Sequence, residues 1–390
     1  MVTFNLFSAS HLKFITMKIG YDAKRAFLNN TGLGNYSRWL IKLLASRYPQ
    51  NTYYLYTPKI RPGKWPDLLR SINNIKIILP RSGLFSSFWR TKGVTANIRQ
   101  DDVHIYHGLS HELPMGIKSA GVKPVVTVHD LIFMRFPQYF DFISRAIYKR
   151  KLTYACKAAD KIIAISENTK HDLIELLLVN ADKIEVIYQG CDASFKQKHD
   201  HLTKQAVRAK YKLPRSFVLS VGTVEERKNL MQVAKALLRI KGDTKLVVVG
   251  RHTKYAEKVK EILRDLDLFD RVIFLERVPF ADLPVIYQMA SVFVYPSRYE
   301  GFGIPILEAL NSGVPVIAAT GSCLQEAGGP GSLYISPDDD EALAGAINRV
   351  LTNDAVKASM IAEGLKFALN FDDDKLAGQY MRLYQQLTDA

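Results

Sequence analysis

The chain has 390 residues, of which 47% are hydrophobic, and it carries a net charge of +15. This length predicts about two or three globular domains, and no uninterrupted apolar run is long enough to cross a membrane. Three scattered cysteines exclude a disulfide framework and a cysteine-based zinc site. We therefore expect a soluble globular protein of a reducing cytoplasm.

The positive charge is concentrated in one half of the chain. Residues 1–200 carry 29 Lys and Arg against 15 Asp and Glu, whereas the remainder carries 24 against 23. Such an asymmetry favours an anionic partner for the first half, either nucleic acid or an acidic membrane surface. A general contribution to solubility is the alternative interpretation.

The first half predicts alternating strands and helices. Residues 1–16 lack the continuous hydrophobic stretch of a signal peptide, so we interpret them as an extension that precedes the fold. Strands are expected to start near Lys18, Thr52, Ile75, Val103, Val125, Ile162 and Ile184, and helices to cover Asn35–Arg47, Phe142–Ala158 and Thr169–Leu177.

The second half repeats this alternation after a polar stretch, residues 195–212, which is predicted to be a linker. Its expected strands start near Phe217, Lys245, Val272, Val292, Val314 and Leu333, and its helices near Leu230, Tyr255, Ala281, Ile304, Leu324 and Glu341. The pattern predicts an α/β protein with two Rossmann-like, doubly wound parallel-sheet domains, residues 17–194 and 213–370, that face each other across a cleft. Residues 371–390 are predicted to form a last helix.

The most informative motif runs from Glu300 to Glu308. It follows a predicted buried strand, Ser291–Pro296, and leads into a helix that starts at Ile304. A glycine-rich loop at a helix N-terminus offers free N–H groups and a positive dipole end, which suit a phosphate. Two carboxylates beside it suit a ligand that also carries hydroxyls, such as a sugar nucleotide. An ordinary capped helix with acidic residues is the alternative.

A second strand, Phe217–Gly222, leads into a turn that carries Arg227 and Lys228. The planar fork of an arginine and the compact charge of a lysine both suit a diphosphate. A solvated, charged helix cap is the alternative.

Together these segments resemble the signature of the glycosyltransferase group 1 family (family 4), retaining enzymes of the GT-B fold. The signature is a Glu, seven residues and a second Glu, here Glu300 and Glu308, preceded by Tyr295-Pro296-Ser297. Further segments look like other landmarks of the family in the same order: Met17–Ala23 with Thr31–Tyr36, Val125–Leu131, Ala164–Glu167 and Val186–Asp192.

The resemblance implies a role for each residue of the two motifs. The donor sugar would be held by Glu300 and the backbone of Gly301, Phe302 and Gly303, and the ribose by Glu308. Lys228, Arg227 and the N–H groups at Ile304 would stabilise the diphosphate, with Gly222 and Thr223 beside it. Many members of the family carry an arginine at the position of Thr223, so Lys228 is a firmer assignment than Arg227.

The resemblance also implies that the last helix, residues 371–390, would cross back to pack on the first domain, and it extends to the first half. The Gly32–Gly34 loop would close on the donor diphosphate beside the acceptor site; a flexible connection before a helix capped at Asn35 is the alternative. His129, at the end of an apolar strand, would hydrogen-bond the donor sugar. Asp130 is interpreted as turn-forming or as orienting His129, and His107 as a weaker acceptor-side candidate.

The implied reaction moves a hexose from a nucleoside diphosphate sugar, a substrate rather than a cofactor, to a hydroxyl of a glycan or lipid-linked acceptor. The segments from His107 and from His129 look most like bacterial mannosyltransferases of surface-polysaccharide pathways, so GDP-mannose is the first expected donor and a UDP-hexose the second. A GT-B sugar-nucleotide epimerase is one alternative. A basic nucleic-acid-binding protein is a more distant one, because no known nucleic-acid-binding module is present.

No metal is expected, because the acidic clusters have other interpretations. Asp265-Leu266-Asp267 lies at the end of a helical pattern, and the clusters at residues 338–340 and 372–374 each precede a helix and are typical of N-terminal caps.

Two basic segments of the first half predict reversible binding to the cytoplasmic leaflet of the membrane. Residues 81–92 interleave aromatic and basic residues, as in an amphipathic interfacial helix. A second cluster, Arg145 with residues 149–151, falls on another helix. The alternative is that Phe85, Phe88 and Trp89 pack in the core.

Overall fold

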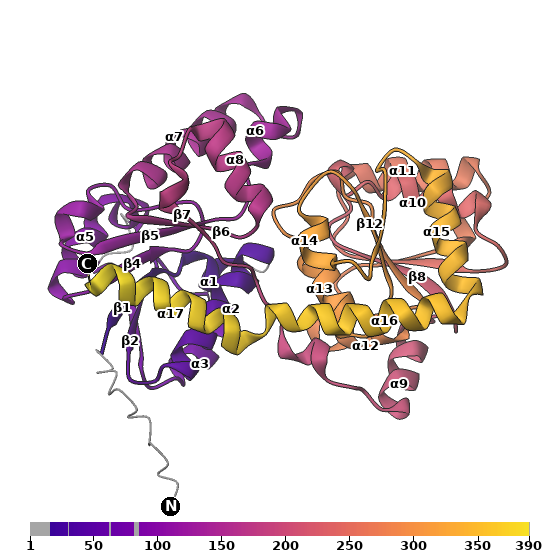
Figure 1. The fold of residues 1–390 in the computed structure, drawn as a ribbon, viewed down its shortest axis with the longest axis horizontal. Helices are drawn as coiled ribbons and strands as arrows, with labels where there is room; N and C mark the ends of the chain where they lie inside the picture. Colours follow the sequence, from indigo (N-terminus) through magenta and orange to yellow (C-terminus); the bar gives the residue numbers. More distant parts are fainter. Residues whose placement is uncertain (1–15, 30, 62–63, 82–85, 390) are drawn as a thin grey trace, which may run out of the picture. The chain divides into compact units, whose positions relative to one another are not determined.

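The computed structural model describes residues 16–29, 31–61, 64–81 and 86–389, and strands and helices alternate along it (Figure 1). Every strand predicted from the sequence is present and starts within two residues of the expected position. No helix in the described part of the chain is long and apolar enough to cross a membrane.

The first sheet has seven strands in the order β3-β2-β1-β4-β5-β6-β7. Each pairing whose register is described in it is parallel. Strands of a parallel sheet are covered on both faces, which accounts for their nearly continuous apolar sequences. The strands are β1 (Lys18–Asp22), β2 (Thr52–Tyr56), β3 (Ile75–Ile78), β4 (Ile105–Gly108), β5 (Lys123–Val128), β6 (Lys161–Ala164) and β7 (Ile184–Val186).

The second sheet has six strands in the order β10-β9-β8-β11-β12-β13, and their pairings are also parallel. These strands are β8 (Phe217–Val221), β9 (Lys245–Val249), β10 (Val272–Leu275), β11 (Val292–Tyr295), β12 (Val316–Ala319) and β13 (Leu333–Ile335). Two parallel, helix-covered sheets confirm the predicted fold class.

The helices lie between successive strands, and the last of them follow β13. Those that accompany the first sheet are α1 (Lys24–Leu28), α2 (Gly32–Arg47), α3 (Lys64–Arg70), α4 (Ser86–Phe88), α5 (Val94–Gln100), α6 (Ile132–Arg135), α7 (Phe142–Ala158) and α8 (Glu167–Leu177). Those that follow are α9 (His201–Tyr211), α10 (Leu230–Ala236), α11 (Lys254–Asp265), α12 (Leu283–Met289), α13 (Ile304–Asn311), α14 (Leu324–Gly328), α15 (Asp340–Thr352), α16 (Asp354–Ala368) and α17 (Asp373–Asp389).

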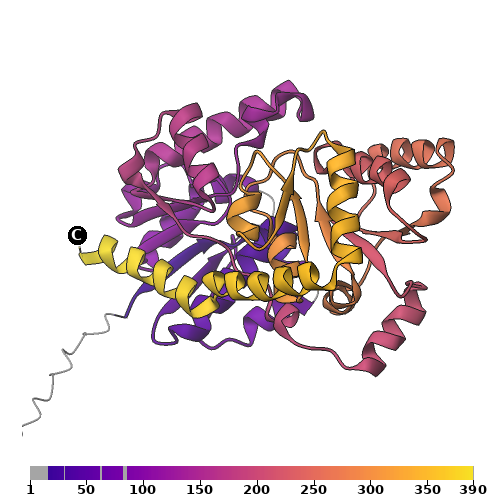
Figure 2. The same ribbon diagram turned by 45° about the vertical axis from the view of Figure 1, so that its right-hand side comes forward.

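A core of aliphatic side chains packs α10, α11 and α15 against the second sheet. Val233 of α10, Val259 of α11 and Ile347 of α15 are all inaccessible to solvent and share one cluster with Val218 and Val292 of the central strands. Figure 2 shows α15 lying along the sheet, where it packs against β11, β12 and β13. This core fixes the ends of β8 and β11, which carry the two sequence motifs.

The described chain divides into two compact units. The first runs to His107 and includes Pro114–Pro124, and the second comprises Gly108–Leu113 and Val125–Asp389. The second unit therefore contains β6 and β7 as well as the whole second sheet, together with α17. Most of the predicted site residues lie within this unit.

Two local predictions were wrong. Gly32 and Gly34 do not form a loop, because α2 already begins at Gly32. A Cβ atom at Gly34 would lie 1.9 Å from the carbonyl oxygen of Asn29, so glycine permits the close approach of the two backbones. The predicted linker also contains α9, whose N-terminus is capped by the Asp200 side chain through the Thr203 N–H.

The segment after Arg81 is helical from Ser86 onwards, as predicted, but it is not a regular amphipathic helix. Phe85 lies outside the described residues, and Trp89–Gly93 form a π-helical turn. Arg90 is largely buried and pairs with Asp22 at 2.7 Å, so its charge is neutralised within the protein. Phe88 is exposed, whereas Trp89 donates a hydrogen bond from Nε1 to Asn97 at 2.8 Å.

Candidate active site

Two neighbouring strands of the second sheet end side by side, and the loops that follow them form the candidate site. β8 and β11 pair in parallel, so their carboxyl ends lie at the edge where ligands bind in α/β sheets. The Arg298 N–H donates to the carbonyl oxygen of Arg227 at 2.9 Å, and Ser297 Oγ lies 3.3 Å from the same oxygen. The turn after β8 and the loop after β11 are thereby joined.

The carboxylate of Glu300 lies at the centre of this site. Its Oε1 atom accepts hydrogen bonds from Lys228 Nζ and Ser297 Oγ, both at 2.5 Å. It also lies 2.8 Å from Arg227 Nη1 and 3.1 Å from the Tyr295 hydroxyl. Burial alone would raise the pKa of Glu300, but the charges of Lys228 and Arg227 outweigh it and hold the pKa at about 2. Glu300 is therefore ionised at neutral pH.

The two cations of the site share Glu300 but differ in their second partner. Lys228 Nζ also donates to the Tyr295 hydroxyl at 2.5 Å, and burial lowers the pKa of Lys228 although Glu300 opposes this. Arg227 is held between two carboxylates, because its Nη2 lies 2.7 Å from Glu225 Oε1. Burial lowers the pKa of Arg227, but Glu300 and Glu225 together raise it above its ordinary value. Arg227 is thus part of the cluster rather than a solvent-facing residue.

The loop from Glu300 to Gly303 is held from behind by groups distant in the sequence. The Cys323 Sγ atom lies 3.0 and 3.1 Å from the carbonyl oxygens of Glu300 and Phe302, which share its single S–H donor. Ser166 Oγ donates to the carbonyl oxygen of Gly301 at 2.7 Å. A Cβ atom at Gly301 would lie 1.9 Å from the carbonyl oxygen of His129. The loop therefore packs directly on the end of β5, within the same unit.

Both ring nitrogens of His129 have partners in the protein. Its Nε2 atom is 2.9 Å from the carbonyl oxygen of Leu109, and its Nδ1 atom is 3.2 Å from Gln189 Nε2. His129 is buried, and its backbone N–H donates to His111 Nε2 at 2.8 Å. Asp130 accepts a hydrogen bond from the Ile132 N–H at 3.1 Å, in keeping with its interpretation as a turn-forming residue.

Glu308 lies on the second turn of α13, and its hydrogen-bond partner is not a member of the Lys228 cluster. Its Oε2 atom accepts a hydrogen bond from the Tyr287 hydroxyl at 2.9 Å. Burial raises the pKa of Glu308 to about 7, only partly offset by this hydrogen bond. A carboxyl group that titrates near neutral pH can both donate and accept hydrogen bonds, which suits a partner with hydroxyls.

The remaining predicted residues are divided between the two units. Gly222 and Thr223 follow β8, and the Gly222 N–H donates to the carbonyl oxygen of Val249 at 2.9 Å. His107 lies in the first unit, as Gly32 and Gly34 do. It is fully buried in β4, with its ring 5.9 Å from that of Tyr21.

The sequence did not identify every residue that shapes the site. Tyr295 and Ser297 could have been predicted from the sequence, because they lie at the end of the strand directly before Glu300. Cys323 and Ser166 could not have been predicted, because their contacts with the loop depend on the tertiary fold. Asn229 is a further addition: it is buried with a φ of 57°, and its Nδ2 atom donates to the carbonyl oxygen of Pro337 at 2.7 Å.

One group of side chains in the described residues could in principle hold a metal ion: His171, Asp172 and Glu175 on α8. Arg135 already occupies this position, because its Nε is 2.7 Å from Asp172 and its guanidinium also pairs with Glu175. Asp265 ends α11 and Asp339 caps α15 through the Ala342 N–H at 2.8 Å, as their sequence positions indicated.

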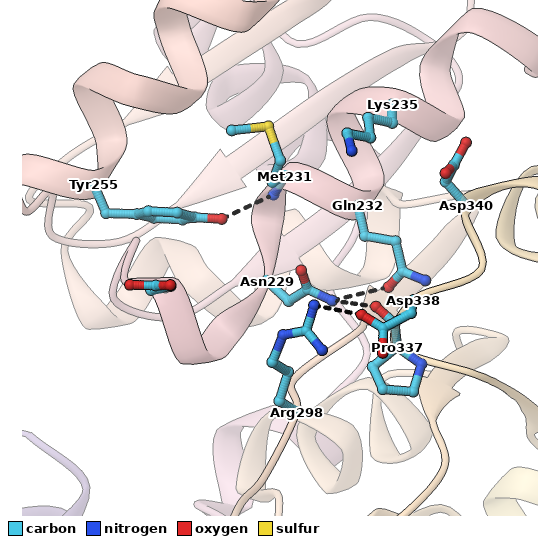
Figure 3. A pocket seen from close by; sticks show the side chains of 10 residues that line it. Asn229, Met231, Gln232, Lys235, Tyr255, Arg298, Pro337, Asp338 and Asp340 are labelled. Carbon is cyan, nitrogen blue, oxygen red and sulfur yellow. Dashed lines mark hydrogen bonds and ion pairs between the residues drawn. The ribbon is translucent and has the colours of Figure 1, made fainter. Parts of the chain in front are cut away.

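A separate open pocket of about 280 Å³ lies at the start of α10 (Figure 3). Neither Lys228 nor Glu300 lines it, so it flanks the candidate site rather than containing it. The Arg298 side chain closes one side through its 2.6 Å contact with Asp338. The lining residues mix both signs of charge: Glu226, Asn229, Met231, Gln232, Lys235, Tyr255, Arg298, Pro337, Asp338 and Asp340.

The Glu300 cluster lies at the ends of two parallel strands of the second sheet, and comparison with known proteins gives the family. Residues 32–195 match the model of Glycosyltransferase Family 4, and residues 203–367 match that of Glycosyl transferases group 1. The chain belongs to this glycosyltransferase family.

The chain is similar to several bacterial mannosyltransferases. It is 29% identical to the O-antigen chain mannosyltransferase B of Escherichia coli, over 95% of this chain and 100% of that protein. It is 31% identical to the O-antigen chain mannosyltransferase RfbU of Salmonella typhimurium, over 58% of this chain and 60% of that protein. These relatives support a hexosyltransferase activity.

A solved structure confirms the GT-B fold. The structure of HepE from Anabaena in complex with UDP and glucose matches with a TM-score of 0.73 and 19% identity, over 95% of this chain and 100% of that chain.

Proposed function

We propose that this protein transfers mannose from GDP-mannose to a hydroxyl of a polysaccharide or lipid-linked acceptor. The observation that carries the proposal is the cluster in which Lys228 and Arg227 converge on Glu300 at the joined ends of β8 and β11. The choice of mannose follows from the relatives, two of which are named O-antigen chain mannosyltransferases.

The cations of the cluster would stabilise the leaving diphosphate. As the bond between the sugar C1 atom and the phosphate oxygen breaks, negative charge develops on that oxygen, and enclosed positive groups interact with it strongly. Lys228 has a single carboxylate partner, so it is better placed than Arg227 to exchange Glu300 for a phosphate oxygen. Glu300, once released, would be free to accept hydrogen bonds from the sugar hydroxyls.

The same reaction accounts for the other predicted residues. The acceptor oxygen would attack C1 on the face that the phosphate leaves, so the configuration at C1 is retained, and the acceptor proton would pass to the departing phosphate. No enzymatic base is then needed, in agreement with an engaged His129. Glu308 would bind the ribose.

The proposal is tested by incubating the protein with labelled GDP-mannose and a surface-glycan acceptor. A mannosylated product is expected, and its NMR coupling constants would show whether the configuration at C1 matches that of the donor. Release of inverted product would contradict the retaining mechanism. Conversion of the donor to a different sugar nucleotide without acceptor would instead identify an epimerase.

A UDP-hexose is the second candidate donor, because the similar HepE structure contains UDP and glucose. A thermal-shift series with GDP, UDP and ADP and their sugars separates the candidates, since a ligand that binds only the folded state raises the melting temperature. A larger shift with GDP-mannose than with any UDP-sugar is expected.

A further inference from the structure

Helix α7 presents an apolar surface to solvent at its N-terminal end. Phe142, Ile143 and Ile147 are 79%, 70% and 47% exposed. At 100° per residue these three side chains fall within one side of the helix. Leu152 and Ala155, which are buried, fall on the opposite side. Large side chains that are exposed together in this way usually mark a binding surface.

The charge of the same helix is of one sign. Its 17 residues contain no Asp or Glu. Lys149 and Arg150 are exposed and have no acidic partner among the described residues, whereas Lys151 pairs with Glu112 at 3.2 Å. Asp141, which precedes the helix, is engaged as its N-cap with the Ser144 N–H. The basic residues of α7 are Arg145, Lys149, Arg150, Lys151 and Lys157.

We propose that α7 binds an anionic membrane surface, with Phe142, Ile143 and Ile147 inserted at the level of the lipid headgroups. Lys149 and Arg150 come less than one helical turn after Ile147. They are therefore placed to contact the lipid phosphates. A nucleic acid would match the charge but would leave the apolar end exposed to water. An anionic bilayer matches both halves of the surface.

This attachment is independent of the transfer reaction, and it rests on the proposed function only in bringing the protein to a lipid-linked acceptor. It replaces the segment from Arg81 to Lys92 as the principal contact with the membrane. It would place the protein at the cytoplasmic face of the plasma membrane, where the sequence predicted it.

The test is co-sedimentation of the full chain with vesicles of phosphatidylcholine alone or mixed with phosphatidylglycerol. Wild type is expected to bind only the mixed vesicles, and less at about 500 mM than at about 50 mM salt. Each basic residue near such a surface strengthens binding about fivefold, so a Lys149→Glu/Arg150→Glu variant should bind at least about tenfold more weakly. A Phe142→Ser/Ile143→Ser variant should also lose binding.

Matched controls lie elsewhere on the surface. Lys254→Glu/Lys258→Glu makes the same charge change on the exposed face of α11, and Leu202→Ser removes a 75% exposed side chain from α9. Both should sediment as wild type does, and circular dichroism should show that every variant is folded. Transfer to a water-soluble acceptor should be unchanged by the α7 variants, which separates loss of attachment from loss of activity.

Three outcomes would overturn the proposal: equal binding to neutral and anionic vesicles, no binding to either, or equal loss of binding in the control variants. Self-association of the wild type that the Phe142→Ser/Ile143→Ser variant abolishes would assign this surface to a second copy of the chain instead.

Discussion

Ser166 donates a hydrogen bond to the carbonyl oxygen of Gly301, 2.7 Å away and 135 residues later in the chain. The same hydroxyl accepts the N–H of Thr169 at 3.0 Å and thereby caps α8. One side chain thus fixes both the start of a helix beside the first sheet and the loop that presents Glu300.

Replacing Ser166 should affect both stability and turnover. The Ser166→Ala variant loses a helix cap and a buried hydrogen bond, which should lower the free energy of unfolding by about 1–3 kcal/mol, and turnover should fall because the Gly301 loop is less well fixed. Urea denaturation and steady-state kinetics measure the two effects. The control is Asn353→Ala, which removes a cap from α16 far along the chain and should lower stability alone. Equal turnover in the two variants would refute the positioning role of Ser166.

Lys228→Ala should lower kcat/KM by about 10²-fold or more. The interaction of the enclosed Lys228 charge with the leaving phosphate becomes stronger in the transition state, and the variant loses it. The matched control is Lys235→Ala, since Lys235 is an exposed lysine of α10 without a part in the Glu300 cluster. Initial rates with saturating acceptor measure the effect. Wild-type rates in Lys228→Ala would show that the diphosphate binds elsewhere.

Glu300 should stabilise the fold above the ordinary carboxyl pKa and cease to do so in acid. Its pKa is lowered from 4.5 to about 2 in the folded protein, so the unfolded chain binds its proton first as the pH falls from about 4.5 towards 2. Glu300→Gln should therefore unfold more easily than wild type at pH 7, by on the order of 2 kcal/mol, and this difference should shrink at pH 3. A difference that does not change with pH would be inconsistent with the ion cluster.

Glu308 should have the opposite effect. Its pKa is raised from 4.5 to about 7 in the folded protein. Between these two pH values the carboxyl group is therefore protonated in the folded protein and ionised in the unfolded chain. The contribution of Glu308 to stability should accordingly fall as the pH rises from about 4.5 to about 7 and stay constant above. Unfolding of wild type and Glu308→Gln at pH 5, 6 and 8 measures it. An advantage of wild type that grows with pH would contradict the assignment.

Transfer should not require a metal ion. The cations of Lys228 and Arg227 would take the role that Mg²⁺ or Mn²⁺ has at other phosphate sites. Activity should be unchanged after dialysis against EDTA. Activity that EDTA abolishes and Mg²⁺ or Mn²⁺ restores would show that the diphosphate is held in some other way.

The sequence was sufficient to predict the strands of both sheets and the long helices with clear boundaries. The bounds of α7 were predicted as observed, because Ala158 ends an uninterrupted helical pattern that Asp141 caps. By contrast α16 was not predicted. It buries Gly364 and Ala368 beside Met360, and such small side chains carry little hydrophobic signal although they permit close helix packing.

The candidate site was predicted as a set of residues but not as an arrangement. Lys228 and Glu300 were each placed after a strand by local patterns. Their ion pair depends on β8 and β11 being neighbours although two strands separate them in sequence, and the sequence pattern does not specify strand order. Gly32 and Gly34 illustrate a different limit. Glycines in a sequence indicate a loop, but here they lie in the first turn of α2, where Gly34 allows the helix to pack closely against the backbone of Asn29.

The hydrogen bonds of Cys323 give the site a built-in chemical reporter. All three cysteines are buried, and the Cys323 thiol, whose pKa burial raises, is turned towards the carbonyl groups of Glu300 and Phe302. It can react with a maleimide only while the loop has moved away. In a chain without Cys156 and Cys191, the labelling rate would therefore measure how often the loop from Glu300 to Gly303 opens. A donor bound at this loop would slow the labelling.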